Sequence, residues 1–194
     1  MQPSDLLGID ARIWQALIAG GVVALGWIVA GWRSRAEASR LRAERLRDAH
    51  RALFAEIRNA CADYWAEGEA DAQAAALTAR MESDPEFVPF VPHEIHDRVF
   101  VAMLGEIDVL PRQTIDAVIA FYAIVASIAA LTEDMRGRGF RMLEPQRRLS
   151  VYRDYMAMRR RAFVMGQNAM KLISAFAEGG APAAERMSRR LGAR

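Results

Sequence analysis

The residues with the clearest capacity for chemistry are two histidines and two carboxylic acids in one short stretch of chain. The stretch contains His93, Glu94, His96 and Asp97, and histidine and carboxylate side chains are common ligands of zinc and iron. Its spacing differs from the His-Glu-x-x-His motif of zinc proteases and from the paired Glu-x-x-His helices of di-iron bundles. Near the start of a helix, the positive end of the helix dipole also favours acidic side chains. We therefore predict a helix-capping role for this stretch and no metal site.

Other signatures of catalysis or cofactor binding do not occur in the sequence. It contains no glycine-rich phosphate-binding loop, and none of its serines has the context of a nucleophile elbow. The acidic residues of the middle region show no pairing typical of a general acid and base. The single cysteine, Cys61, lies in an apolar helical stripe, which favours a buried core thiol over a nucleophile. We predict that the protein is not an enzyme and holds no cofactor.

Arginines near the C-terminus form a candidate binding surface. Residues 135–194 contain 14 basic and 4 acidic residues, whereas residues 59–134 contain 3 basic and 14 acidic ones. The basic surface consists of Arg147, Arg148, Arg159, Arg160 and Arg161. Such a surface can contact the phosphates of nucleic acid, anionic lipid headgroups or the acidic middle of the same chain. Membrane lipid and internal pairing are the simpler interpretations, and nucleic acid is the least favoured.

An uncharged apolar segment near the N-terminus predicts a membrane anchor. Residues 13–32 contain no charged side chain, and at about 1.5 Å per residue a helix of this length spans roughly 30 Å, the thickness of the bilayer core. Trp14 and Trp32 lie at its ends and Trp27 lies within it; tryptophan is enriched where a helix meets the headgroups. A cleaved signal peptide would have a basic leader and a shorter apolar core, so we predict one transmembrane helix.

The charges beside this segment predict its orientation. A basic collar of Arg33, Arg35, Arg40 and Arg42 follows the segment, whereas only Arg12 precedes it closely. Because basic flanks stay in the cytoplasm, residues 1–12 should lie outside and the rest of the chain inside. The arginine bias, with Lys171 as the sole lysine, is typical of a GC-rich genome and suggests a bacterial source. The expected location is therefore the inner, cytoplasmic membrane.

The rest of the chain is predicted to be all-α, because no segment shows the alternation typical of a strand. A seam at Ala43, Leu46, His50, Leu53, Ile57, Ala60 and Tyr64 has the three- and four-residue spacing of a helix. We therefore expect a long, partly coiled-coil-like first helix that packs mainly on later helices of its own chain.

Breaks in the pattern divide this body further. Three prolines within 84–92 predict a loop, with helices expected over about 70–81, about 112–135 and from Pro145 onwards. The predicted domains are thus the anchor at 13–32, a helical cytoplasmic domain at 33–178 and a disordered basic tail at 179–194.

Three functional hypotheses follow, of which the least favoured is an enzyme that uses His93 and His96. The favoured one is a membrane-anchored helical scaffold or adaptor that binds a protein partner, or a second copy of itself, at the cytoplasmic face. The alternative is a subunit of an oligomeric transport or pore assembly, with a second span at 117–132. That segment is uncharged but has only 16 residues between Asp116 and Glu133, which is short for a crossing and ordinary for a core helix.

Overall fold

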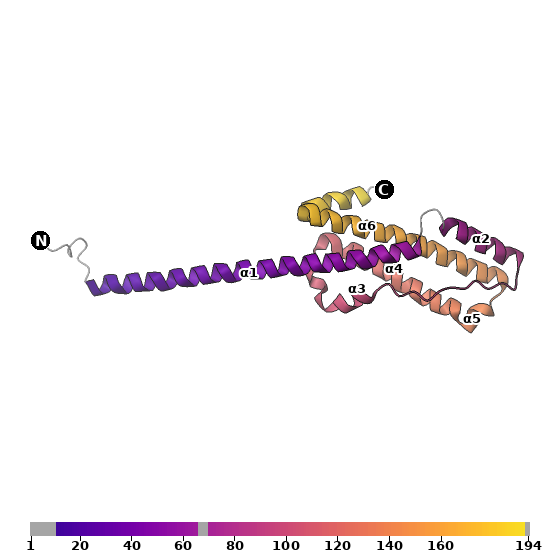
Figure 1. The fold of residues 1–194 in the computed structure, drawn as a ribbon, viewed down its shortest axis with the longest axis horizontal. Coiled ribbons are helices and arrows are strands. Elements are labelled where there is room, and N and C mark those ends of the chain that lie inside the picture. Colours follow the sequence, from indigo (N-terminus) through magenta and orange to yellow (C-terminus); the bar gives the residue numbers. More distant parts are fainter. Residues whose placement is uncertain (1–10, 66–69, 193–194) are drawn as a thin grey trace. The chain divides into compact units, whose positions relative to one another are not determined.

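The computed structural model describes residues 11–65 and 70–192, and over these residues it is all-helical, with no strand. The elements are α1 (Ala11–Tyr64), α2 (Ala70–Ser83), α3 (Arg98–Met103), the 3₁₀ helix η2 (Leu104–Val109), α4 (Arg112–Arg136), α5 (Arg138–Arg141) and α6 (Pro145–Gly192) (Figure 1). The predicted all-α class is confirmed, as are the helices near 70–81 and 112–135 and the helix start at Pro145.

The chain divides into two compact units, Met1–Arg45 and Leu46–Arg194, and α1 supplies residues to both. In the described part of the first unit, large apolar side chains between 18 and 32 are exposed, including Trp27 at 79% and Trp32 at 71%. Trp14 and four other side chains of the predicted span lie outside the described residues. The membrane anchor at 13–32 therefore stays a prediction.

The second unit has its core between α1, α4 and α6. Leu53 and Ile57 of α1 are fully buried, as are Val118 and Phe121 of α4, and α4 packs along α6. The predicted seam of α1 faces this core from His50 to Tyr64, so these positions pack on later helices of the same chain.

A buried polar pair joins α1 to the start of α4. His50 Nε2 lies 3.0 Å from Thr114 Oγ1, and Thr114 also donates to the carbonyl of Pro111. The imidazole meets the ring of Phe176 edge-on, with 5.4 Å between the ring centroids. Burial lowers the pKa of His50, so the neutral form is favoured in the folded protein. The polar residue in the seam is thus accommodated by a hydrogen bond.

Among the described residues, α4 is the helix whose length and composition would allow it to cross a membrane. One side of α4 nevertheless forms the core of the second unit. Its buried residues are Thr114, Val118, Phe121, Tyr122, Ile124, Val125, Ile128, Thr132 and Met135. Burial inside the protein therefore accounts for most of the large apolar side chains of this helix without a membrane, although Ile119 is exposed.

The predicted disordered tail at 179–194 is wrong as far as Gly192, because residues 181–192 form a helical arm. The chain turns at Gly179 and at Gly180, which has φ 62°, a conformation that glycine adopts without steric cost. After this turn the arm folds back along the part of α6 that precedes Gly179 (Figure 1). Ala184 is fully buried, and Gln113 donates to Glu185 at 3.1 Å. Tertiary packing thus orders a segment whose composition is typical of a loose terminus.

At Gly166, α6 lies very close to α1 and α4. A methyl group on its Cα would collide with Cys61 Sγ and would lie 3.0 Å from Phe121 Cε2 and 3.2 Å from Ile57 Cγ2. Cys61 is buried, as predicted, and burial raises the pKa of its thiol to about 11. The missing side chain of Gly166 therefore sets how closely three helices pack.

We expect Gly166→Ala to destabilise the protein by up to about 2 kcal/mol. An extra methyl group in a packed core costs about 1–3 kcal/mol, whereas alanine gains about 1 kcal/mol over glycine in a helix. Urea unfolding followed by circular dichroism measures the difference. The matched control is Gly139→Ala, because no atom lies within 4 Å of a side chain added there. Equal stability of the two variants would contradict close packing at Gly166.

Candidate functional site

The most unusual segment of the second unit is the loop at 84–97, which joins α2 to α3 without regular structure. The loop predicted at 84–92 is confirmed, but it extends five residues further and includes His93, Glu94 and His96. The predicted capping role holds for the position of Asp97 alone. Asp97 occupies the cap position of α3 but makes no side-chain cap hydrogen bond, and Glu94 binds other partners.

The start of α3 is capped instead by a residue from α1. Glu56 accepts hydrogen bonds from the backbone nitrogens of Val99 at 2.7 Å and Phe100 at 3.1 Å, and from the Tyr122 hydroxyl at 2.6 Å. The first N–H groups of a helix lack partners within the helix, and a carboxylate there also suits the helix dipole. Glu56, 43 residues before Val99 in the sequence, thus caps α3 in place of a neighbouring side chain.

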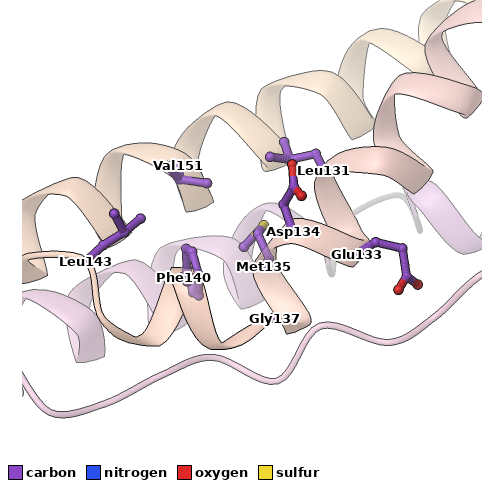
Figure 2. A pocket seen from close by; sticks show the side chains of 9 residues that line it. Leu131, Glu133, Asp134, Met135, Gly137, Phe140, Leu143 and Val151 are labelled. Carbon is purple, nitrogen blue, oxygen red and sulfur yellow. The ribbon is translucent and has the colours of Figure 1, made fainter.

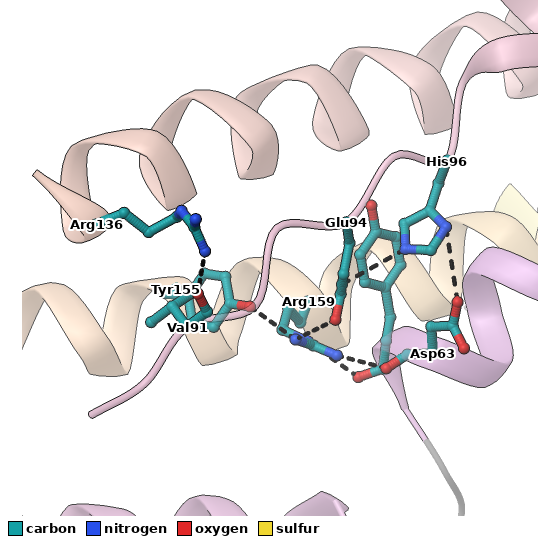
Figure 3. A network of polar contacts seen from close by, with 8 residues as sticks. Asp63, Val91, Glu94, His96, Arg136, Tyr155 and Arg159 are labelled. Atoms are coloured by element: carbon teal, nitrogen blue, oxygen red, sulfur yellow. Dashed lines mark hydrogen bonds and ion pairs between the residues drawn. The ribbon is translucent and has the colours of Figure 1, made fainter.

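At the centre of the site, Arg159 of α6 joins three segments of chain (Figure 3). Its Nε donates to the carbonyl of Tyr64 at 3.3 Å, and one Nη2 hydrogen goes to the carbonyl of Asp63, so it caps the last turn of α1. Its Nη1 donates to Glu94 Oε1 at 3.4 Å and to the Tyr155 hydroxyl at 2.7 Å. Four of the five guanidinium donors are therefore used inside the protein.

His96 extends this network on the loop side. Its Nδ1 lies 3.7 Å from Asp63 Oδ2, and its Nε2 lies 3.4 Å from Glu94 Oε2. The ring also meets Tyr64 edge-on, with 4.9 Å between centroids. Because its two nitrogens face different carboxylates, the three side chains do not converge on one point. Within the described residues, no group of three or more histidine, cysteine or acidic side chains could hold a metal ion.

The charges of the network stabilise one another. Burial by itself would raise the pKa of Glu94, but the hydrogen bond with His96 and the charge of Arg159 outweigh burial and hold that pKa below its ordinary value. Glu94 is therefore ionised at neutral pH and balances the guanidinium. An arginine whose donors are already used has little capacity to bind a substrate anion, so the geometry is that of a structural clamp.

Two more arginines hold the same loop. Arg148 of α6 donates to the carbonyls of Leu143 at 2.9 Å and Arg141 at 3.1 Å and also to the carbonyl of Pro85. Arg136 of α4 donates to the carbonyl of Val91 at 3.1 Å. Arg136, Arg148 and Arg159 are named here the arginine clamp. Together they bind the loop near its start, its middle and its end.

This clamp corrects the predicted basic surface. Arg148 is only 7% exposed and the Arg159 side chain 13%, so neither is available to lipid or a partner. Arg160 is exposed but lies 2.9 Å from Asp71 of α2, while Arg147 and Arg161 are exposed. The basic surface is therefore smaller than predicted. The other expectation, pairing of the basic end with the acidic middle, is supported by the contacts Arg153–Glu82, Arg159–Glu94 and Arg160–Asp71.

Beside the loop lies a hollow of about 440 Å³ between the end of α4, α5 and the start of α6 (Figure 2). Apolar side chains and two carboxylates line it, namely Leu131, Glu133, Asp134, Met135, Phe140, Leu143 and Val151, together with Gly137 and Gly139. His93 of the loop lies 2.6 Å from Glu133 through Nδ1 and Oε1, so the loop runs along the edge of the hollow. Sequence reasoning missed this feature because its lining comes from three separate elements.

The loop exposes two large apolar side chains, Phe90 and Ile95. Phe90 is 84% exposed, whereas Val91, the following residue, is buried and its carbonyl is held by Arg136. Met142, adjacent to the lining residue Leu143, is 71% exposed.

In comparisons with protein-family models, curated proteins and solved structures, nothing matches this chain.

We expect Arg159→Met to lower the free energy of unfolding by about 3 kcal/mol. Removing one member of a buried, hydrogen-bonded ion pair leaves the other charge uncompensated. Here Glu94 would lose its cation, and two carbonyls of α1 would lose their donor. Urea unfolding is the measurement, and adding Glu94→Gln should recover part of the loss.

Arg160→Met is the matched control, since both members of the Arg160–Asp71 pair are about 60% exposed. Exposed pairs contribute about 0–1 kcal/mol. If the Arg159 and Arg160 variants lost the same stability, the clamp would have no special structural role.

Proposed function

We propose that the protein is a membrane-anchored helical scaffold or adaptor whose second unit binds a protein partner at the cytoplasmic face. The observation that carries the proposal is Phe90, a large apolar side chain that a clamped loop keeps in solvent. The same loop contacts the edge of the partly apolar hollow through His93 and Glu133. Nothing in the arginine clamp offers a free nucleophile or a converging acid and base. A binding role therefore suits the described residues better than catalysis does.

The anchor is supported by the cost of leaving residues 18–32 in water. Ile18, Val22, Leu25, Trp27 and Trp32 each expose more than half of their surface. Burying one large apolar side chain gains about 1.5–3 kcal/mol, so insertion of the whole segment in lipid is strongly favourable. The exposed collar from Arg33 to Arg42 supports the orientation with the second unit in the cytoplasm of a bacterium.

The docking region consists of Phe90, Met142 and the hollow. Holding Phe90 on a backbone fixed by Arg136 means that little conformational entropy is lost when a partner covers it. Aromatic anchors at rigid positions commonly dominate the energy of protein interfaces. The carboxylates of Glu133 and Asp134 at the hollow favour a partner that brings an apolar side chain flanked by a basic one.

The alternative of a transport or pore subunit draws on the length and composition of α4. Crossing a bilayer with α4 would require the contacts of its core face with α1 and α6 to be replaced by lipid or other helices. The pair His50–Thr114 and the bond from Tyr122 to Glu56 would also be broken. We therefore favour a single span.

We predict that the full-length chain fractionates with membranes and that a reporter fused after Arg194 lies in the cytoplasm. A charged residue at the bilayer centre costs at least about 2.5 kcal/mol, so Val22→Asp combined with Leu25→Asp should shift protein to the soluble fraction. Ala157→Asp, at an exposed position of α6, is the control. A reporter outside the cytoplasm would instead support two spans.

We also predict that a photo-crosslinking side chain at Met142 captures one discrete protein partner in cells, and that capture depends on Phe90. Phe90→Ser should abolish the product because the anchor side chain is lost, whereas Phe90→Leu should largely retain it. Crosslinking followed by electrophoresis and mass spectrometry measures this. A product of equal yield in both variants would contradict docking at Phe90.

A further inference from the structure

The exposed face of α4 carries no charge between Asp116 and Glu133, and no contact within the second unit explains this. The core side of the helix is apolar because it is buried, but the outer side is exposed to solvent. Its exposed residues in this stretch are Ile119, Ala123, Ala126, Ser127, Ala129 and Ala130. Helices at the surface of a globular domain usually carry charged and polar residues on the solvent side.

We propose that this face of α4 is the contact surface of an antiparallel, two-fold dimer of the chain. The proposal concerns the second unit alone and does not rest on the membrane anchor or on the docking region at Phe90. Two observations carry it: the size of the side chains on the face, and the charges at its two ends.

The side chains on the face suit a second helix better than lipid. Four of the six are alanines, which gain little by transfer from water because they bury little apolar area. Small side chains do, however, let two helix backbones approach within about 8 Å, where dispersion contacts are numerous. The Ser127 hydroxyl donates to the carbonyl of Ala123 at 3.0 Å. A second helix can therefore exclude water from this face without leaving the hydroxyl unpaired.

The charges at the ends of the face select the antiparallel arrangement. Arg112 and Asp134 are both exposed, and each stands eleven residues from Ala123. If two copies pack antiparallel with Ala123 on the two-fold axis, Arg112 of each copy lies at the level of Asp134 of the other. In a parallel pair, Asp116 would face Asp116 and Glu133 would face Glu133, and these like charges would repel.

The size of the face predicts a weak dimer. The uncharged stretch is about 24 Å long at 1.5 Å per residue, so α4 alone offers much less than the roughly 800 Å² per partner of a stable complex. Neighbouring side chains can enlarge the contact. Phe100 of α3 stacks on Tyr122 of α4 with ring centroids 4.0 Å apart, and the following residues Val101 and Leu104 are about half exposed.

Disulfide formation in the full-length chain tests the contact. Ala123→Cys places one thiol at the two-fold axis, where two copies can bring their Cα atoms within the 4.4–6.8 Å that a disulfide needs. Mild oxidation should give a covalent dimer. Ala157→Cys, an exposed alanine on α6, should not, and the wild type is a further control because Cys61 is buried. Equal yields at 123 and 157 would overturn the proposal.

Charge exchange then tests the register, with circular dichroism confirming that each variant is folded. In the Ala123→Cys background, Arg112→Glu should reduce dimer yield at least tenfold, and adding Asp134→Arg should restore it. A yield insensitive to both changes would overturn the antiparallel arrangement. So would the absence of dimer combined with quenching of a fluorophore on Cys at 123 by brominated lipid in anionic vesicles, since that result identifies lipid as the occupant.

Discussion

The second unit depends on how the polar backbone of one irregular loop is satisfied. Prolines remove donors from residues 84–92, so few carbonyls of this loop can find a donor in its own backbone, as Asp84 does with the N–H of Phe87. Buried backbone groups without partners are costly. The arginine clamp supplies donors from two helices: Arg148 and Arg136 donate to the carbonyls of Pro85 and Val91, and Arg159 pairs with the carboxylate of Glu94. Because α4, α6 and the end of α1 all contribute, the clamp fixes their relative positions together with the loop.

This arrangement explains the uneven charge of the sequence. The acidic middle and the basic end would each repel themselves if they stood apart, but their opposite charges meet along α6. The exposed Arg153–Glu82 and Arg160–Asp71 pairs lie between the alanine-rich α2 and α6, while the Arg159–Glu94 pair is more buried. Arginine suits this work because its planar group serves several carbonyls at once.

The helices could be predicted because proline, glycine and apolar spacing act locally, as at Pro145 and across 84–92. The clamp could not, because its partners are far apart in sequence. In the sequence, Arg159 interrupts an apolar seam. Its hydrogen-bond acceptors are Glu94, 65 residues away, and the carbonyl of Asp63, 96 residues away. Nothing in the sequence near Arg159 indicates these partners. The arm after Gly180 was missed for the same reason, since the burial of Ala184 depends on a helix that precedes the turn.

Two segments of this chain, 13–32 and 117–132, contain no charged residue, but they differ in the size of the side chains they expose. Between 18 and 32 the exposed side chains are isoleucine, valine, leucine and tryptophan, whereas on the outer face of α4 they are mostly alanine. Large apolar side chains gain most from transfer into lipid, and small ones gain most from close contact with another helix. The side chains exposed by the two uncharged segments thus suit different partners, the lipid proposed for the first segment and the second copy of α4 proposed for the other.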